Sequence, residues 1–115
     1  MGRSQQKGAR FEQMCADYIT GNSDLKVIRK RLHGAKDEGD LFGLSIAGEE
    51  SVVECKDCKK MELAQWVDES EVEMHNANAK YAIVIHHRKG KGAKNFGDNY
   101  VTMTLDMLLK IIQNN

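Results

Sequence analysis

Apolar positions recur at helical spacing near the start, in the middle and at the end of the chain. Residues 5–20, 61–79 and 105–112 each carry an apolar stripe that predicts an amphipathic helix. Short apolar and β-branched runs between these stripes predict strands. The predicted strands cover residues 26–32, 41–47, 51–56, 81–86 and 100–104. The order helix, three strands, helix, two strands, helix predicts one α/β domain over residues 1–115, with a mixed central sheet flanked by helices.

The links between the predicted strands determine how they pair. The turn at residues 48–50 is short enough to make its two flanking strands an antiparallel hairpin. This hairpin returns Glu54 to the end of the sheet at which Asp40 stands. Alternation along a strand places Glu54 and Lys56 on one face. The later order strand, helix, strand implies a crossover and parallel pairing. We therefore expect Asp40, Glu54 and Lys56 to lie together.

The composition is that of an ordinary globular domain, with 30% charged and 41% hydrophobic residues. No apolar run is long enough to cross a membrane, and no signal-peptide pattern opens the chain. Cys15, Cys55 and Cys58 are interpreted as reduced thiols of a cytoplasmic protein, and the Cys55/Cys58 pair lacks the second ligand pair that a zinc site needs. His86 and His87 are adjacent, so we expect them on opposite faces of a strand. No membrane partner and no small-molecule cofactor are expected.

The formal net charge of zero hides separate basic and acidic blocks. Residues 1–36 hold eight Lys/Arg against three Asp/Glu, and residues 80–98 hold five against one. Residues 37–54 hold six acids and no base, and residues 62–73 hold five acids and no base. A basic block can grip a phosphate backbone, whereas an acidic block can hold a metal ion or form a solvated face. The acids of the second predicted helix, Glu73 among them, are expected on a solvated face.

Three short motifs together resemble a known family. Gly39-Asp40, followed by Glu54-Cys55-Lys56 and preceded by the helical Glu12, resembles the PD-(D/E)XK nuclease superfamily. The opening Lys7-Gly8-Ala9-Arg10-Phe11-Glu12 is similar to the archaeal-type Holliday junction resolvases, which are small dimeric enzymes. The resemblance implies a single-domain restriction-endonuclease-like fold. The usual proline before the first acid is replaced here by Gly39.

The resemblance also implies a catalytic set and a metal. Glu12, Asp40, Glu54 and Lys56 would be catalytic. Mg²⁺, with Mn²⁺ as substitute, would be held by Asp40, Glu54, the backbone carbonyl of Cys55 and, through water, Glu12. Lys56 would orient or help deprotonate the attacking water, or neutralise charge in the transition state. Gln65 is a possible supporting residue beside the carboxylates.

The cations of the basic blocks are the candidate DNA contacts. They are Arg3, Lys7, Arg10, Arg29, Lys30, Arg31, Arg88, Lys89, Lys91 and Lys94. The last four lie in the glycine-rich segment 88–97, which is expected to be a mobile loop and is either a solvated hairpin loop or a DNA-contacting arm. Phosphate contacts position a protein without reading sequence. Few exposed aromatic residues are expected, which favours recognition of DNA shape over stacking on bases.

The sequence therefore predicts a Mg²⁺-dependent, structure-selective DNA endonuclease that resolves four-way junctions. Symmetric cutting of two strands calls for a C2 homodimer, whose interface could involve Trp66 or the last helix. Three alternatives remain at this stage: another restriction-like or repair nuclease of the same fold, a non-catalytic DNA-binding module, and an α/β interaction protein with merely exposed acids.

Overall fold

The computed structural model describes residues 3–30 and 37–114, and the elements along them follow the predicted order. Three helices, six strands and one 3₁₀ helix are present within these ranges. They are α1 (Arg3–Gly21), β1 (Ile28–Arg29), β2 (Leu41–Phe42), β3 (Ser45–Ile46), β4 (Glu49–Lys56), α2 (Leu63–Ala77), β5 (Tyr81–His86), the 3₁₀ helix η1 (Ala93–Asp98), β6 (Tyr100–Thr102) and α3 (Leu105–Gln113). No helix in the described part of the chain is both long and apolar enough to span a membrane.

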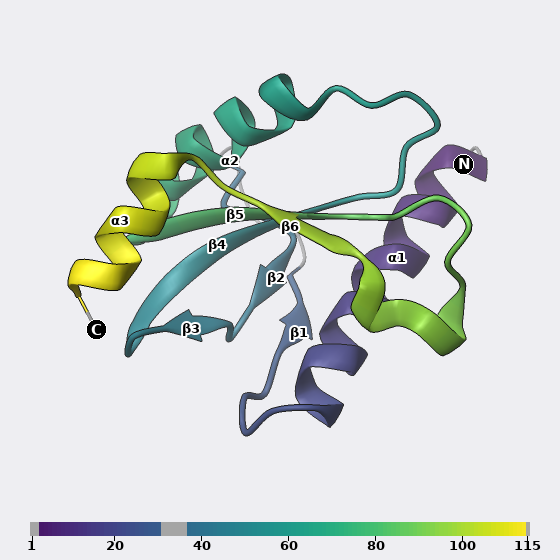
Figure 1. Cartoon of the computed structure of the whole chain (residues 1–115), viewed down its shortest axis with the longest axis horizontal. Helices are drawn as coiled ribbons and strands as arrows, with labels where there is room; N and C mark the ends of the chain where they lie inside the picture. Colours follow the sequence, from purple (N-terminus) through teal and green to yellow (C-terminus); the bar gives the residue numbers. More distant parts are fainter. Residues whose placement is uncertain (1–2, 31–36, 115) are drawn as a thin grey trace.

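The strands form one open mixed sheet with helices on both faces. Its order is β1-β2-β4-β5-β6, and β3 pairs with β4 beside β2. β4 and β5 are parallel and are joined by the crossover helix α2, whereas the other pairs are antiparallel. Figure 1 shows α1 on one face of the sheet, with α2 and α3 on the other. The predicted mixed sheet flanked by helices is confirmed.

The central strand β4 contributes to a core on each face because its side chains alternate. Val53 and Cys55 pack against Phe11 and the other buried residues of α1. Val52 faces the opposite way and packs with residues of α2 and α3. Burial on both faces explains why Val52 and Val53 are both apolar, although neighbouring strand residues face opposite sides.

The predicted strand 41–47 is divided into β2 and β3 by Gly43. Gly43 has a φ of +103°, and a Cβ there would collide with the carbonyl oxygen of Lys26. Only glycine fits such a position without strain. The hairpin turn lies at Ala47 and Gly48, which both have positive φ, as a two-residue type I′ connection requires. β4 therefore begins at Glu49 rather than at residue 51.

Two further boundaries differ from the predictions. The expected strand 26–32 is reduced to β1, and its last two residues lie outside the described residues. The segment 88–97, expected to be a mobile loop, instead contains most of η1. Phe96 of η1 packs against Phe11 and Tyr18 of α1, with ring centroids 5.6 and 5.5 Å apart. The basic and glycine-rich composition of the segment favoured a loop, and the packing of Phe96 on α1 was not predicted.

Candidate metal centre

Asp40 and Glu54 stand next to each other on paired strands. Leu41 is aligned with Val53, and the amide of Asp40, just before it, donates a 2.8 Å hydrogen bond to the carbonyl of Val53. The Cys55 amide in turn donates to Asp40 Oδ2 at 2.8 Å. The predicted meeting of the two acids is confirmed. No observed contact tests the predicted role of the Cys55 carbonyl.

Gly39 sets the approach of the chain to Asp40. Its φ is +99°, and a Cβ there would lie 3.0 Å from Cγ1 of Val52. Proline is fixed near φ −65° and cannot adopt this conformation. A proline at position 39 would therefore not fit this backbone path.

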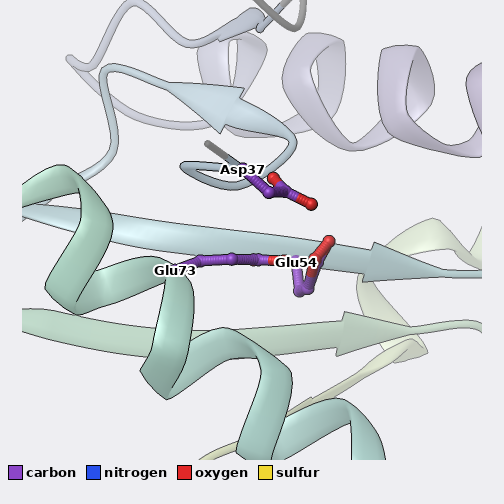
Figure 2. A group of neighbouring side chains, drawn as sticks. All are labelled: Asp37, Glu54 and Glu73. Atoms are coloured by element: carbon purple, nitrogen blue, oxygen red, sulfur yellow. The ribbon is translucent and has the colours of Figure 1, made fainter. Parts of the chain in front are cut away.

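Two acids outside the predicted catalytic set, Asp37 and Glu73, lie beside Glu54. One carboxylate oxygen each of Asp37, Glu54 and Glu73 lie within 4.8 Å of one another. Figure 2 shows Asp37 on the loop before β2, Glu54 on β4 and Glu73 reaching across from α2, with their carboxyl groups converging. Asn76 of α2 donates to the Asp37 carbonyl at 2.9 Å, which holds this loop against the helix.

Glu73 corrects the expectation of a solvated acidic face on α2. Its side chain is buried, with 5% of the residue exposed. Trp66, Ser70 and Glu73 follow each other by four and three positions, so they share one helix face, and all three are buried. That spacing was visible in the sequence, but the neighbouring acids masked it.

Two of these carboxylates have oxygens that lack a hydrogen-bond partner. Glu54 is 4% exposed, and its Oε2 has no partner among the described residues. Oε1 of the similarly buried Glu73 is also unpartnered there. A buried carboxylate oxygen without a partner is costly. The cluster therefore offers hard oxygen donors, which are the ligands that Mg²⁺ and Mn²⁺ prefer.

Burial and repulsion between carboxylates raise the pKa values of Asp40, Glu54 and Glu73. Burial, followed by the charge of Glu54 and a hydrogen bond with it, raises the pKa of Asp40 to about 9. Burial also raises the pKa of Glu54 to about 8, although the hydrogen bond from Asp40 opposes the shift. The pKa of Glu73 rises to about 7, again mainly through burial. A cation bound among them would replace protons on these carboxylates.

Lys56 extends from the same face of β4 as Glu54. Its Nζ lies 3.6 Å from Oε2 of Glu69 on α2. Burial acts to lower the pKa of Lys56, but the charges of Glu54 and Glu69 outweigh it, so the pKa is raised. Gln65 donates to Oε1 of Glu69 at 3.1 Å, and it lines a hollow of about 500 Å³ together with Asp37, Glu69 and Glu73. Gln65 thus borders the cluster without a hydrogen bond to Glu54.

Glu12 lies on the α1 side and is engaged elsewhere. Its Oε1 accepts a 2.9 Å charge-assisted hydrogen bond from Nε of Arg29. The charge of Glu12 contributes, as the last of several causes, to the raised pKa of Asp40. Glu12 is therefore near the acidic pair, while Arg29, predicted to contact phosphate, neutralises it in this structure.

Several other predicted phosphate contacts also have partners within the chain. Lys30 pairs with Glu38 at 3.6 Å and Lys91 with Asp98 at 3.3 Å. Arg88 lies over the ring of Tyr100. Others extend into solvent, namely Arg10, Lys89 and Lys94. Arg31 and the side chain of Arg3 lie outside the described residues.

No protein-family model, no curated protein sequence and no solved structure matches this chain. The chemistry of the site is therefore inferred from its own residues. These residues are a group of carboxylates, of which Glu54 and Glu73 are buried, with one lysine beside them.

Proposed function

We propose that this protein is a Mg²⁺-dependent endonuclease with a restriction-endonuclease-like fold that cuts branched DNA, most specifically four-way junctions. The observation that carries the proposal is the juxtaposition of Asp40, the unpartnered Oε2 of Glu54 and, two residues further along the same strand face, Lys56. An acid pair can hold a divalent cation, and an adjacent lysine can stabilise the negative charge that develops in phosphodiester hydrolysis. The resemblance of the motifs to the PD-(D/E)XK superfamily adds support.

Asp40 and Glu54 are the residues that would hold the metal, and Glu73 and Asp37 would complete its surroundings. The buried, unpartnered oxygens of Glu54 and Glu73, with an oxygen of Asp37 close to them, fit a hard divalent cation. Bound there, Mg²⁺ would polarise the scissile phosphate and lower the pKa of a coordinated water. The Cys55 amide, which donates to Asp40 Oδ2, fixes the orientation of that carboxylate.

Lys56 acts in this proposal as a charge stabiliser rather than as a base. Its raised pKa keeps the ammonium group protonated at neutral pH. A protonated lysine cannot accept the proton of the attacking water, but it can donate hydrogen bonds to developing negative charge. Its ion pair with Glu69 holds the side chain on the α2 side of the sheet.

The cleavage experiment compares four-way junctions with linear duplexes of the same sequence, with Mg²⁺ and with EDTA. Cutting that requires Mg²⁺ and prefers the junction is expected. Glu54→Gln should lower the rate about 1,000-fold, because losing several kcal/mol of metal-based stabilisation costs a factor of ten per 1.36 kcal/mol. Glu62→Gln, at an exposed acid on the border of α2, is the matched control. Preference for linear DNA, or full activity of Glu54→Gln, would contradict the proposal.

A symmetric dimer would place two such sites on one junction, and the C-terminal segment offers an apolar surface for it. Four large apolar residues of α3 are exposed, with Leu105 at 72% and Ile112 at 58%. Leu108 and Leu109 accompany them, and exposed apolar patches of this kind mark association sites. Trp66, the other interface candidate, is buried in the core instead.

The dimer can be tested by sedimentation. A dimer that becomes a monomer on the change Leu108→Lys is expected, since a buried unpaired charge disrupts an apolar interface. Val72→Lys, at an exposed apolar position of α2, is the control. A monomeric wild-type protein, also in the presence of a four-way junction, would rule out the symmetric dimer.

A further inference from the structure

A second hollow lies on the opposite face of the sheet from the acidic cluster, between α1 and the segment that contains η1. Its volume is about 590 Å³, within the roughly 300–1,000 Å³ typical of small-molecule sites. Aromatic and aliphatic side chains form its walls, and cations stand around it. Neither the metal centre nor the proposed hydrolysis makes use of it.

The walls of this hollow are aromatic. Phe11 lies 5.6 Å from Phe96 and 5.8 Å from the ring of His87, centroid to centroid, and Met14 lines the same space. Flat apolar surfaces of this kind bind the faces of nucleobases, and each base stacked on an aromatic side chain contributes appreciably to affinity. The sequence prediction of few aromatics for stacking did not include this site, because Phe11 and Phe96 are far apart along the chain.

The charges around the hollow suit an anion. Lys7, Arg10 and Lys91 line it, against the single carboxylate of Asp57. Asp57 is already engaged, with Lys7 Nζ at 3.5 Å and His87 Nδ1 at 3.0 Å from its Oδ1. Arg10 is exposed and has no ion pair among the residues described. A ligand with a flat ring and a negative charge, as in a nucleotide, complements these walls and cations.

The hollow adjoins the end of β4 that carries the proposed catalytic lysine. Asp57 directly follows Lys56, and the amide of His87 donates to the Lys56 carbonyl at 3.0 Å. Nε2 of His87 contacts the carbonyl of Lys91 at 2.7 Å. These bonds fix the glycine-rich segment against the sheet, so the hollow exists before any ligand binds.

We infer that this hollow binds one unstacked nucleotide of the DNA substrate, with its base against Phe96 and Met14 and its phosphate at Arg10 and Lys7. The inference rests on the proposed function in that the ligand is DNA. It adds a base-binding site to a protein whose other predicted contacts are to phosphates. Unpaired or easily unstacked bases occur at branch points, and duplex DNA would present none, so the site would favour branched DNA over linear duplex.

Gly92 allows the hollow to be filled without removing any existing contact. It lines the hollow, its φ of −101° and ψ of −162° are open to any residue, and a Cβ there would meet no heavy atom within 4 Å. The variant Gly92→Phe therefore tests the space itself. Arg10→Glu tests the charge at an exposed position of α1, and Lys80→Ala, at the start of β5 at the far end of the sheet, is the control.

The experiment measures binding without cleavage, with EDTA present. The probes are a ten-residue oligothymidylate and a four-way junction that carries 2-aminopurine beside its branch point. We expect Gly92→Phe and Arg10→Glu each to weaken oligothymidylate binding about 10-fold and to suppress the 2-aminopurine fluorescence change, whereas Lys80→Ala has no effect. Circular dichroism establishes whether each variant is folded. If Gly92→Phe does not fold, Arg10→Glu alone tests the inference.

The outcomes separate this inference from the proposed function. Folded pocket variants that bind both probes as the wild type does would overturn the base-binding site, whatever the cleavage result. Another outcome is that the wild type cuts no DNA with Mg²⁺ while Gly92→Phe still weakens oligothymidylate binding. In that case the endonuclease proposal fails and the nucleotide site stands.

Discussion

At the end of β4, acidic side chains on the two faces of the sheet have opposite environments. On the α2 face, Glu54 is buried beside Asp40 and keeps an unpartnered oxygen. On the α1 face, Asp57 also leaves the end of the same strand, but Lys7 and His87 both contact its Oδ1. The two positions are only three residues apart, and strand alternation sends their side chains to opposite sides.

The difference separates an acid that has partners within the chain from acids whose buried oxygens lack them among the described residues. Paired with two partners, Asp57 fastens α1 and the η1 segment to the sheet. Glu54 and Glu73 are buried with their charges opposed by few cations, which destabilises the folded protein unless protons or a metal ion bind there. Such local conflicts are characteristic of functional sites.

Substitutions on the two faces should differ most in their effect on the cleavage rate. Lys56→Met should lower the single-turnover rate about 100-fold or more, because it removes a charge aimed at the transition state. Asp57→Asn, which alters the α1 face, should leave the rate within about 10-fold, since it touches no reacting group. Quenched-flow measurement at saturating junction concentration separates the rate from binding.

Lys60→Met, at an exposed lysine just beyond β4, is the control for the loss of one positive charge. Equal decreases in cleavage rate for Lys56→Met and Asp57→Asn would contradict the proposal that only the face carrying Lys56 takes part in the reaction.

The next largest effect is expected on metal affinity, and it tests whether Glu73 supports metal binding. Glu73→Gln should weaken Mn²⁺ binding about 10–100-fold, as the loss of groups that support metal ligands commonly does. Isothermal titration calorimetry on the protein alone measures it. Glu62→Gln should bind Mn²⁺ as the wild type does. An unchanged affinity for Glu73→Gln would mean that the buried acid of α2 is structural.

Short-range patterns predicted most of the fold. The strand 81–86 has the predicted bounds because all of its residues are buried, and a strand buried on both faces reads as a nearly continuous apolar run. The meeting of Asp40 and Glu54 followed from a short turn and strand register. The interruption of the predicted strand at Gly43 was not foreseen. It depends on the close approach of Lys26, which lies in a distant segment of the chain.

The site was predicted only in part for a related reason. Motif spacing identified the acids of the strands, but Glu73 enters from a helix across the sheet. Phe96 and Phe11 likewise form the second hollow only after β5 and η1 bring them together. A sequence pattern records which face of its own element a residue occupies, and it does not record which distant element that face will meet.

The smallest expected effect is on stability, and its sign distinguishes the two faces. The folded-state pKa values of Asp40, Glu54 and Glu73, about 9, 8 and 7, all lie above their ordinary values near 4. The folded protein therefore binds more protons than the unfolded chain between about pH 4 and 9. Without metal, its free energy of unfolding should fall as the pH rises through this window, and urea denaturation with EDTA measures the decline.

Mn²⁺ should reverse this trend, since it binds the deprotonated carboxylates that repel one another without it. Glu54→Gln should be more stable than the wild type at pH 8 by about 1–2 kcal/mol with EDTA present, the usual gain from relieving one unfavourable group. It should also gain less from Mn²⁺. Asp57→Asn should instead lose stability at the same pH, because the acid that it removes is paired. If Glu54→Gln and Asp57→Asn shifted stability in the same direction, the two acids would share one role, and the division between the faces of β4 would be wrong.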